Sequence, residues 1–557
     1  MCFHPNIGEL VDAISFLYTV FSNRFALLAI PLVLTSFTHL WNPIGFPDLF
    51  YDEGVYLRRA MHVLDGLGPQ ESPYYYDHPF FGQLFLAGIF KLLNFPEFME
   101  DGDLTDIRSV DSLYLVPRLL MGVLAIIDTF LVYKIAEKKY GTNVALVASV
   151  LFSVMPITWI FRLVVLDSIL VPFLLSSILL ALDASGTNNR KYALTLMSGI
   201  CFGLAMFVKV PVFAMIPLLW YLVTQSQNES LRQRRYKLLL WFSPVILIPL
   251  LWPIESMLSG HFDSWVDTVI WQAERGNRGV GLLWISGIFV VMDPLLFALS
   301  IAGGIYAMFK RNWLILLWEL PFIMFLALIG QTNYFHWASL MPVFCIASSL
   351  FLVKGLPQLL ASIRMLSAKI TPITIFSVSI LGLCFTTIVV SLDVSMSQRQ
   401  ALSFAISYIE DNKSGNMNKI TIISSPVYSW IFKYVYRADN SLNDFRDVIF
   451  DPIRTPEWLL IADQHFRSEM QVEPKLLQLY GQREIITVLN SYPLSGLESV
   501  SYPYTNLLPT MEGCNVEIAT KGHDQETLSQ DTGSAQRDYL LDCNRTLSRL
   551  QNQYAVR

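Results

Sequence analysis

Residues 371–391 read TPITIFSVSILGLCFTTIVVS and contain no Asp, Glu, Lys or Arg. A helix of about 20 apolar residues is long enough to cross the hydrocarbon core of a bilayer. Similar runs recur upstream, and only 15% of the chain is charged, against about a quarter in soluble proteins. A large soluble protein would instead need many core helices without a polar face. We therefore expect a mainly α-helical protein that crosses a membrane many times.

The apolar runs predict eleven spans, at 25–41, 113–133, 142–160, 164–182, 192–208, 210–224, 238–254, 282–308, 313–330, 336–353 and 371–391. The stretch 80–93 is too short to span comfortably, so we expect a juxtamembrane or re-entrant helix there. The first run follows Arg24 and lacks a clear small-residue cleavage site, which is typical of a retained helix.

The Lys and Arg content of the short loops predicts the orientation of the bundle. The connections 134–141, 183–191 and 225–237 are all basic and share one side of the predicted bundle. The opposite side includes the long acidic and aromatic loop 42–112. Because basic loops normally face the cytoplasm, we expect a multi-pass membrane protein with a cytoplasmic N-terminus. An odd number of spans then places the C-terminal part outside.

A change in composition near residue 395 predicts a second domain. Beyond it, charged residues increase and short β-branched runs such as 420–423 and 458–462 alternate with helical stretches such as 399–411 and 474–480. We expect a transmembrane domain at 1–395, a small extracytoplasmic α/β domain at 396–520 and a polar tail at 521–557. Cys514 and Cys543 could form a disulfide in an oxidising compartment.

The strongest local signal for chemistry is Tyr51–Asp52–Glu53–Gly54–Val55–Tyr56, shortly after the first span. Adjacent carboxylates beside a membrane are costly unless they are solvated or used. A carboxylate here could remove the proton of an acceptor hydroxyl. Taken alone, the pair is more simply a solvated acidic loop.

Other ionisable residues are predicted on the same outer side. An intramembrane or interfacial charge needs a partner or a function, and a convergence of acids and bases at one face suits an anionic lipid-linked substrate. The net charge of −6 is spread along the chain without a basic tract, so we expect no nucleic-acid partner. The residues concerned are Asp77, His78, Arg118, Arg162, Asp167, Lys209, Arg275 and His336.

The order of these motifs resembles a known family. An Asp-Glu-x-x-Tyr motif after the first span, a His-Pro-x-x-Gly motif and an Arg early in the next span look like the dolichyl-phosphate-mannose–protein mannosyltransferases. Their wider GT-C class includes the aminoarabinose transferases. The resemblance covers roughly residues 20–350. It implies a GT-C helical bundle that transfers a sugar, with inversion, from a polyprenyl- or dolichyl-phosphate carrier to a hydroxyl group.

The resemblance also implies roles for single residues. Asp52 would be the general base, and Glu53 would orient the acceptor or the base. The acceptor side would include Tyr56, Asp77 and His78, while Asp167 would support the site or bind an ion. The donor phosphate would be bound by Arg118, Arg162, Lys209, Arg275 and His336.

Phe80–Phe81 and Gln83 depart from the family pattern, which favours the broader relatives over the protein mannosyltransferases. No cofactor is required by any motif. Carboxylates and His at one face could hold a divalent metal ion, although no fixed ligand spacing demands one.

Several of these residues also have structural explanations. Arg118 could pair with Asp128, and Arg162 could pair with Asp167 at a turn. Lys209 could be an interfacial anchor, and His336 could belong to the interfacial aromatic belt.

The most concrete reading is an integral membrane glycosyltransferase. Its partners would be a lipid-phosphate sugar, such as a mannose donor, the membrane, and a protein, lipid or glycan acceptor. The alternatives are a transporter or flippase for a lipid-linked or anionic substrate and a membrane scaffold. Transporters usually place their charges at the midplane and show repeated halves, whereas here the charges gather at one face.

Overall fold

The computed structural model describes residues 24–71, 76–96, 105–185, 190–225, 230–274, 281–329, 334–362, 367–413, 420–450, 453, 457–491 and 514–521. The chain forms two compact units. Unit 1 comprises Met1–Trp41, Gln70–Gly82 and Leu119–Ile388, and unit 2 comprises Asn42–Pro69, Gln83–Arg118 and Val389–Arg557. Parts of the long loop 42–112 thus belong with the C-terminal residues, whereas the boundary at 395 predicted from composition stays a prediction.

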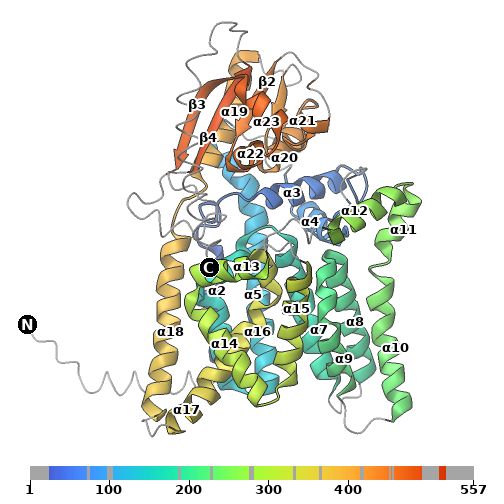
Figure 1. Ribbon diagram of the computed structural model, residues 1–557, viewed down its shortest axis with the longest axis vertical. Coiled ribbons are helices and arrows are strands. Elements are labelled where there is room, and N and C mark those ends of the chain that lie inside the picture. The colour runs from blue at the N-terminus through green and yellow to red at the C-terminus, as the bar shows by residue number, and fades with distance from the viewer. Residues whose placement is uncertain are drawn as a thin grey trace, which may run out of the picture. The chain divides into compact units, whose positions relative to one another are not determined.

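Unit 1 is built from helices (Figure 1). Helix α8 packs against both α7 and α10, and the helices α14, α15 and α16 pack against one another. The bounds are α2 Arg24–Leu40, α6 Thr142–Val154, η2 Pro156–Arg162, α7 Leu166–Ala184, α8 Lys191–Val208, η3 Val210–Met215, α9 Ile216–Thr224, α10 Leu231–Leu247, α11 Leu251–Leu258, α12 Phe262–Glu274, α13 Leu282–Met292, α14 Pro294–Phe309, α15 Trp313–Ile329, η5 Tyr334–Ser339, α16 Met341–Leu350, η6 Phe351–Gly355, α17 Leu356–Ser362 and α18 Ser367–Val390. The long helix α5, Ile107–Tyr140, runs through both units.

The apolar helices show that this is an integral membrane protein. Within the described residues, six helices are long and apolar enough to cross a membrane, or up to eight if each of two bent pairs is one span. Three other predicted spans correspond to shorter apolar helices, Phe25–Leu40, Val210–Thr224 and Trp313–Ile329. All eleven predicted segments are thus helical. The number that cross the membrane, and the direction in which they do so, remain predictions.

The segment predicted as a span at 282–308 is not one continuous helix but a bent pair of helices. Helices α13 and α14 meet at an angle of 116° around Asp293. The side chain of Asp293 accepts a hydrogen bond from the Leu296 amide at 2.9 Å, and Pro294 occupies the first helical position. An Asp cap followed by Pro starts a new helix. The span predicted at 142–160 also bends, by 70°, between α6 and η2, where Pro156 follows Met155.

Unit 2 combines helices with a small mixed sheet, as expected for the C-terminal residues. The strands lie in the order β1-β2-β4-β3, with β1 and β2 parallel and the other pairs antiparallel. The bounds are α3 Tyr51–Leu64, α4 Phe81–Leu92, α19 Met396–Lys413, β1 Thr421–Ile423, α20 Pro426–Trp430, η8 Ile431–Val435, α21 Asp447–Phe450, β2 Trp458–Ala462, α22 Gln464–Met470, α23 Pro474–Gly481, β3 Arg483–Ser491 and β4 Cys514–Lys521. The side chain of Cys514 and all of Cys543 lie outside the described residues, so their disulfide stays a prediction.

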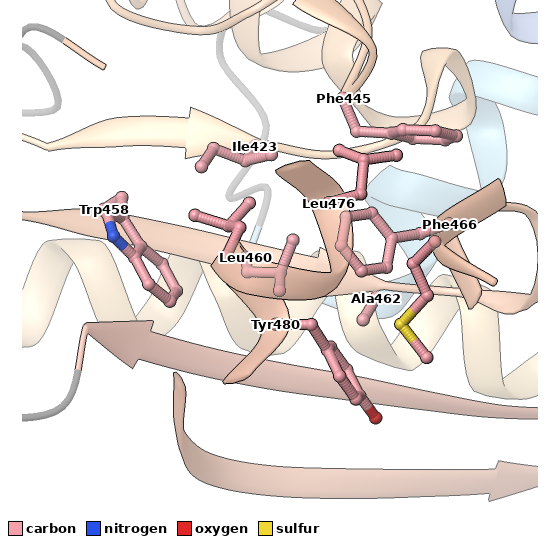
Figure 2. Packing of buried hydrophobic residues seen from close by; sticks show 10 residues of the cluster. Ile423, Phe445, Trp458, Leu460, Ala462, Phe466, Leu476 and Tyr480 are labelled. Carbon is pink, nitrogen blue, oxygen red and sulfur yellow. The ribbon is translucent and has the colours of Figure 1, made fainter. Parts of the chain in front are cut away.

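One hydrophobic core fixes the parallel strands and their helices (Figure 2). Trp458, Leu460 and Ala462 alternate along β2 and point to the same side, as the two-residue period of a strand requires. Phe466 of α22 and Leu476 of α23 cover them. Burying each large side chain contributes about 1.5–3 kcal/mol. This core therefore holds β1 and β2 in place against α22 and α23.

Candidate active site

Asp52 and Glu53 lie in the first turn of α3, and the loop expected around them is a helix from Tyr51 onward. The carboxylate of Glu53 explains where this helix begins. Its Oε2 accepts the Phe50 backbone N–H at 2.9 Å, which satisfies a donor that the helix start would leave unpaired. Acidic residues in a first turn are also favoured by the helix dipole. We call residues 42–54, which lead into this turn, the Asp52 segment.

Arg118 of α5 is fully buried against the Asp52 segment. Its Nε donates to Glu53 Oε1 at 3.0 Å, and its Nη2 donates to Glu53 Oε2 at 2.6 Å. This bidentate geometry is the strongest form of a charge-assisted pair. The remaining N–H groups donate to the backbone carbonyls of Pro43, Ile44, Pro47 and Asp48 at 2.9, 3.3, 2.7 and 2.7 Å.

These contacts change the roles expected for Arg118 and Glu53. The partner of Arg118 is Glu53 and not Asp128, and every N–H direction of the guanidinium is engaged. In this conformation Arg118 has no donor left for a phosphate, so its predicted phosphate contact does not fit. Both carboxylate oxygens of Glu53 are likewise bonded, and the side chain is fully buried. The Asp52 segment therefore wraps around the guanidinium of Arg118, which is bonded to its backbone and to Glu53.

Asp52, next to this buried pair, has a half-buried side chain and remains accessible. Gly54, two residues later, packs so closely on the backbone of Pro426 that a Cβ atom would not fit. Tyr56 is only 6% exposed, which leaves little of it for contact with an acceptor. Within this turn, Asp52 is therefore the residue best placed to meet a substrate.

In unit 1, Lys209 and Asp167 form a buried ion pair with an Nζ–Oδ2 distance of 2.6 Å. Lys209 lies between α8 and η3, while Asp167 lies in the first turn of α7. The Lys209 ammonium also lies 4.7 Å from the centroid of the Phe335 ring, a cation–π contact. The half-buried ring of His336 stacks on Phe335. We call Asp167, Lys209 and Phe335 the Lys209 cluster.

The predicted segment with Asp77 and His78 packs onto the helix ends that carry the Lys209 cluster. The rings of Phe80 and Phe81 lie 4.8 and 6.0 Å from that of Phe207, two residues before Lys209. Gly82 packs against the side chain of Leu166, the neighbour of Asp167, and has no room for a Cβ. The structure thus brings together these parts of the predicted outer surface.

The side chains of Asp77 and His78 are both partly exposed. The His78 Nε2 lies 3.9 Å from Asp77 Oδ2, at 21% and 29% side-chain exposure respectively. Their backbone carbonyls accept hydrogen bonds from Gln272 and Gln70, each at 3.3 Å. The two polar groups are thus held in an ordered turn and remain accessible to a ligand.

The remaining predicted residues contribute differently. Arg162 is fully buried and donates to the carbonyls of Thr38 and Trp41 at 3.3 and 2.6 Å. Asp167 pairs with Lys209 and not, as the sequence suggested, with Arg162. Arg275 lies outside the described residues. Within the described part of the chain, no three His, Cys, Asp or Glu side chains gather as a metal site.

Sequence reasoning missed the polar residues of the C-terminal part that contact the Asp52 segment. Gln464 Nε2 donates to Asp48 Oδ2 at 2.9 Å, and the Gln398 amide exchanges two hydrogen bonds with the backbone of Leu49 at 2.7 and 2.9 Å. One signal was available for Gln464, because it comes two residues after the end of the predicted strand 458–462. Polar residues after a parallel strand often face a ligand site. Nothing in the sequence marks Gln398.

His465, which packs against the Asp52 segment, predicts that the thermal stability of the protein depends on pH. Its ring lies 6.2 and 5.5 Å from the rings of Phe50 and Tyr51, and its buried Nε2 has no hydrogen-bond partner among the described residues. Burial lowers its pKa from the ordinary value of 6.5, and this effect outweighs the nearby Asp463 carboxylate, which favours the protonated ring. The unfolded chain therefore binds a proton at a higher pH than the folded chain does. We expect the thermal midpoint of the detergent-solubilised protein to fall as the pH drops below about 6.5.

The measurement is thermal unfolding between about pH 8 and pH 5. His465→Phe, which keeps an aromatic ring against Phe50 and Tyr51, should lose part of this acid dependence. An unchanged slope in the variant would show that other groups cause it.

The comparisons with known proteins agree with this architecture. Residues 105–252 match the family described as dolichyl-phosphate-mannose-protein mannosyltransferase. This segment includes Arg118, Arg162, Asp167 and Lys209, and Asp52 lies before it. No curated protein sequence matches the chain significantly.

Solved structures share the fold at low sequence identity. ArnT from Cupriavidus metallidurans bound to undecaprenyl phosphate is 11% identical with a TM-score of 0.52, over 89% of this chain and 98% of that chain. The oligosaccharyltransferase AglB from Archaeoglobus fulgidus, in complex with an inhibitory peptide and a dolichol-phosphate, is 11% identical with a TM-score of 0.51, over 84% and 73%. A complex of the Archaeoglobus fulgidus oligosaccharyltransferase with Zn and sulfate is 13% identical with a TM-score of 0.50, over 82% and 71%.

The chain therefore has the fold of the GT-C membrane glycosyltransferases, and the resemblance inferred from its motifs is confirmed. Within that class, the segment 105–252 relates it by sequence to the dolichyl-phosphate-mannose-protein mannosyltransferases.

Proposed function

We propose that this protein transfers a sugar from a polyprenyl- or dolichyl-phosphate carrier to a hydroxyl acceptor at the extracytoplasmic face of a membrane. The observation that supports this most is the accessible Asp52 carboxylate at the start of α3, next to a buried ion pair that fixes its segment. The structural neighbours are described as bound to undecaprenyl phosphate and dolichol-phosphate. Mannose is the sugar that the matched family suggests.

Asp52 would act as the general base. Its carboxylate would take the proton of the acceptor hydroxyl as the oxygen attacks the anomeric carbon, and the bond from that carbon to the carrier phosphate would break. The released lipid phosphate is a good leaving group and needs little acid catalysis. One carboxylate can therefore suffice, and attack opposite the phosphate inverts the anomeric configuration. Glycoside hydrolysis, with a poorer leaving group, generally needs two carboxylates.

Lys209 would bind the donor phosphate, and Asp77 and His78 would contact the acceptor. A cation is favourable near a phosphate diester, and an ammonium supplies a point charge with three donors. One of those donors is used by Asp167. The second predicted cation, Arg118, has its donors engaged by Glu53 and the backbone, so we assign it to the support of the Asp52 segment.

A double variant separates the structural and the functional role of Lys209. Lys209→Met alone leaves the buried Asp167 carboxylate unpaired, which is destabilising. Lys209→Met with Asp167→Leu removes both charges and should fold. If Lys209 binds the phosphate, KM for the lipid-phosphate sugar should still rise at least about tenfold in the folded double variant, which corresponds to about 1.4 kcal/mol. Wild-type kinetics in that variant would assign the pair to structure alone.

The direct test of the function incubates purified protein in liposomes with a panel of radiolabelled polyprenyl- and dolichyl-phosphate sugars and an acceptor extract. We expect label to move from the carrier to a protein, lipid or glycan, and its anomeric configuration to be inverted. Movement of intact labelled carrier across the bilayer, with no transfer of the sugar, would instead identify a flippase and overturn the proposal.

A further inference from the structure

The carboxyl ends of the two parallel strands of unit 2 meet at one edge of the sheet. Ser425 follows β1 and begins α20, and Asp463 follows β2 and caps α22. The Ser425 hydroxyl donates to Asp463 Oδ2 at 2.6 Å, so the two strand ends are joined. In α/β sheets, ligands bind in the crevice outside the carboxyl ends of the strands.

The Asp52 segment occupies this edge. Gln464, directly after Asp463, donates to Asp48 Oδ2 at 2.9 Å, and both side chains are buried. The backbone of Pro426, directly after Ser425, lies against Gly54. These two contacts lie on either side of Asp52 in the sequence. The edge that could hold a ligand therefore holds the chain's own predicted catalytic turn.

A second set of contacts fixes Tyr51, the residue before Asp52. Its hydroxyl donates to Asp444, and its ring lies 5.0 Å from the guanidinium of Arg446 and 5.5 Å from the ring of His465. Burial and the Asp444 carboxylate hold the pKa of Tyr51 well above its ordinary value, so the hydroxyl stays protonated and keeps donating. All of these partners belong to the C-terminal part of unit 2.

We propose that the C-terminal α/β part of the chain positions the general base, with Gln464 and Asp444 as positioning residues that act through Asp48 and Tyr51. This inference rests on the proposed function, because it assumes that Asp52 is the base. It assigns the C-terminal part to the active site itself. Catalysis depends on such support, since a displacement of about 1 Å can lower a rate by 10²-fold.

The first test replaces Gln464 by Leu, which has a similar size and cannot donate to Asp48. We expect kcat of the folded variant to fall about tenfold or more, while KM for the lipid-phosphate sugar stays unchanged. The matched control is Gln471→Leu, because Gln471 is exposed at the end of the same helix, α22. Wild-type kcat in Gln464→Leu, measured on folded protein, would overturn the proposal.

The second test uses Tyr51 and keeps the proposal testable if Gln464→Leu fails to fold. Asp444→Asn retains an oxygen that accepts from the Tyr51 hydroxyl, whereas Asp444→Leu does not. We expect Asp444→Asn to keep most of the wild-type kcat and the limb of the pH–rate profile that reports the base, and Asp444→Leu to lower kcat and shift that limb. Equal kcat and equal profiles in the two variants would overturn the proposal.

The two proposals fail in distinguishable ways. If Asp52→Asn retains wild-type transfer, the base assignment fails, and with it the basis of the positioning role. If Asp52→Asn is inactive while folded Gln464→Leu and Asp444→Leu both keep wild-type kcat and pH profiles, the base assignment stands and the positioning role is wrong.

Discussion

Asp52→Asn is expected to lower kcat for sugar transfer by about 10²–10⁴-fold, because general base catalysis contributes a factor of this size. The amide has the size of the carboxylate but cannot take the proton of the acceptor hydroxyl. KM for the donor should change little, since the base acts on the acceptor. The measurement is the initial rate of transfer from a radiolabelled lipid-phosphate sugar by purified protein.

The fold should tolerate this change. Asp52 is half-buried, and its neighbours Glu53 and Asp48 make hydrogen bonds that shape its segment and that this change leaves in place. Substitutions at such sites usually alter the unfolding free energy by about 0.5 kcal/mol or less. The matched control is Asp65→Asn at the exposed end of the same helix, where an ion pair with Arg437 contributes little. Near-normal turnover in Asp52→Asn would show that another group is the base.

Local patterns in the sequence were sufficient to predict most of the apolar helices and the first two strands, but not the helix α3 within the loop 42–112. The absence of charge over about 20 residues predicts a helix in the membrane, and the short apolar run Trp458–Ala462 is the strand β2 with the same bounds. The break at Asp293 was also readable, because an acid followed by Pro within an apolar run is a helix start. Length and hydropathy alone do not reveal this break.

The contacts inside the candidate site could not be predicted in the same way. Arg118 and Glu53 are 65 residues apart, and Gln464 and Asp48 are 416 residues apart. The predicted topology puts Asp52, Arg118 and Lys209 on one face, but a predicted face does not decide which charges pair. Only packing shows that Arg118 is engaged by four carbonyls and a carboxylate, and that Lys209 is bonded to Asp167. A partnered cation and a phosphate-binding cation look identical in sequence.

Arg118→Met is expected to destabilise the protein by about 3–5 kcal/mol, because it leaves a buried carboxylate without its partner. Both oxygens of Glu53 would lose a donor, and the carbonyls of Pro43, Pro47 and Asp48 would become buried acceptors without their present bonds. Arg118→Lys should be nearly as damaging, since an ammonium cannot reach acceptors arranged around a planar guanidinium. The measurement is thermal unfolding of the solubilised protein.

A double variant tests where this loss originates. Arg118→Met with Glu53→Leu removes the unpaired charge and should recover part of the stability, although the carbonyls stay without donors. Its kcat should remain low, because the Asp52 segment loses the group around which it folds. If instead Arg118→Met unfolds at the wild-type temperature and raises only KM for the lipid-phosphate sugar, then the guanidinium leaves Glu53 to bind the donor phosphate. The assignment from sequence would then be right, and the buried pair would describe a state without substrate.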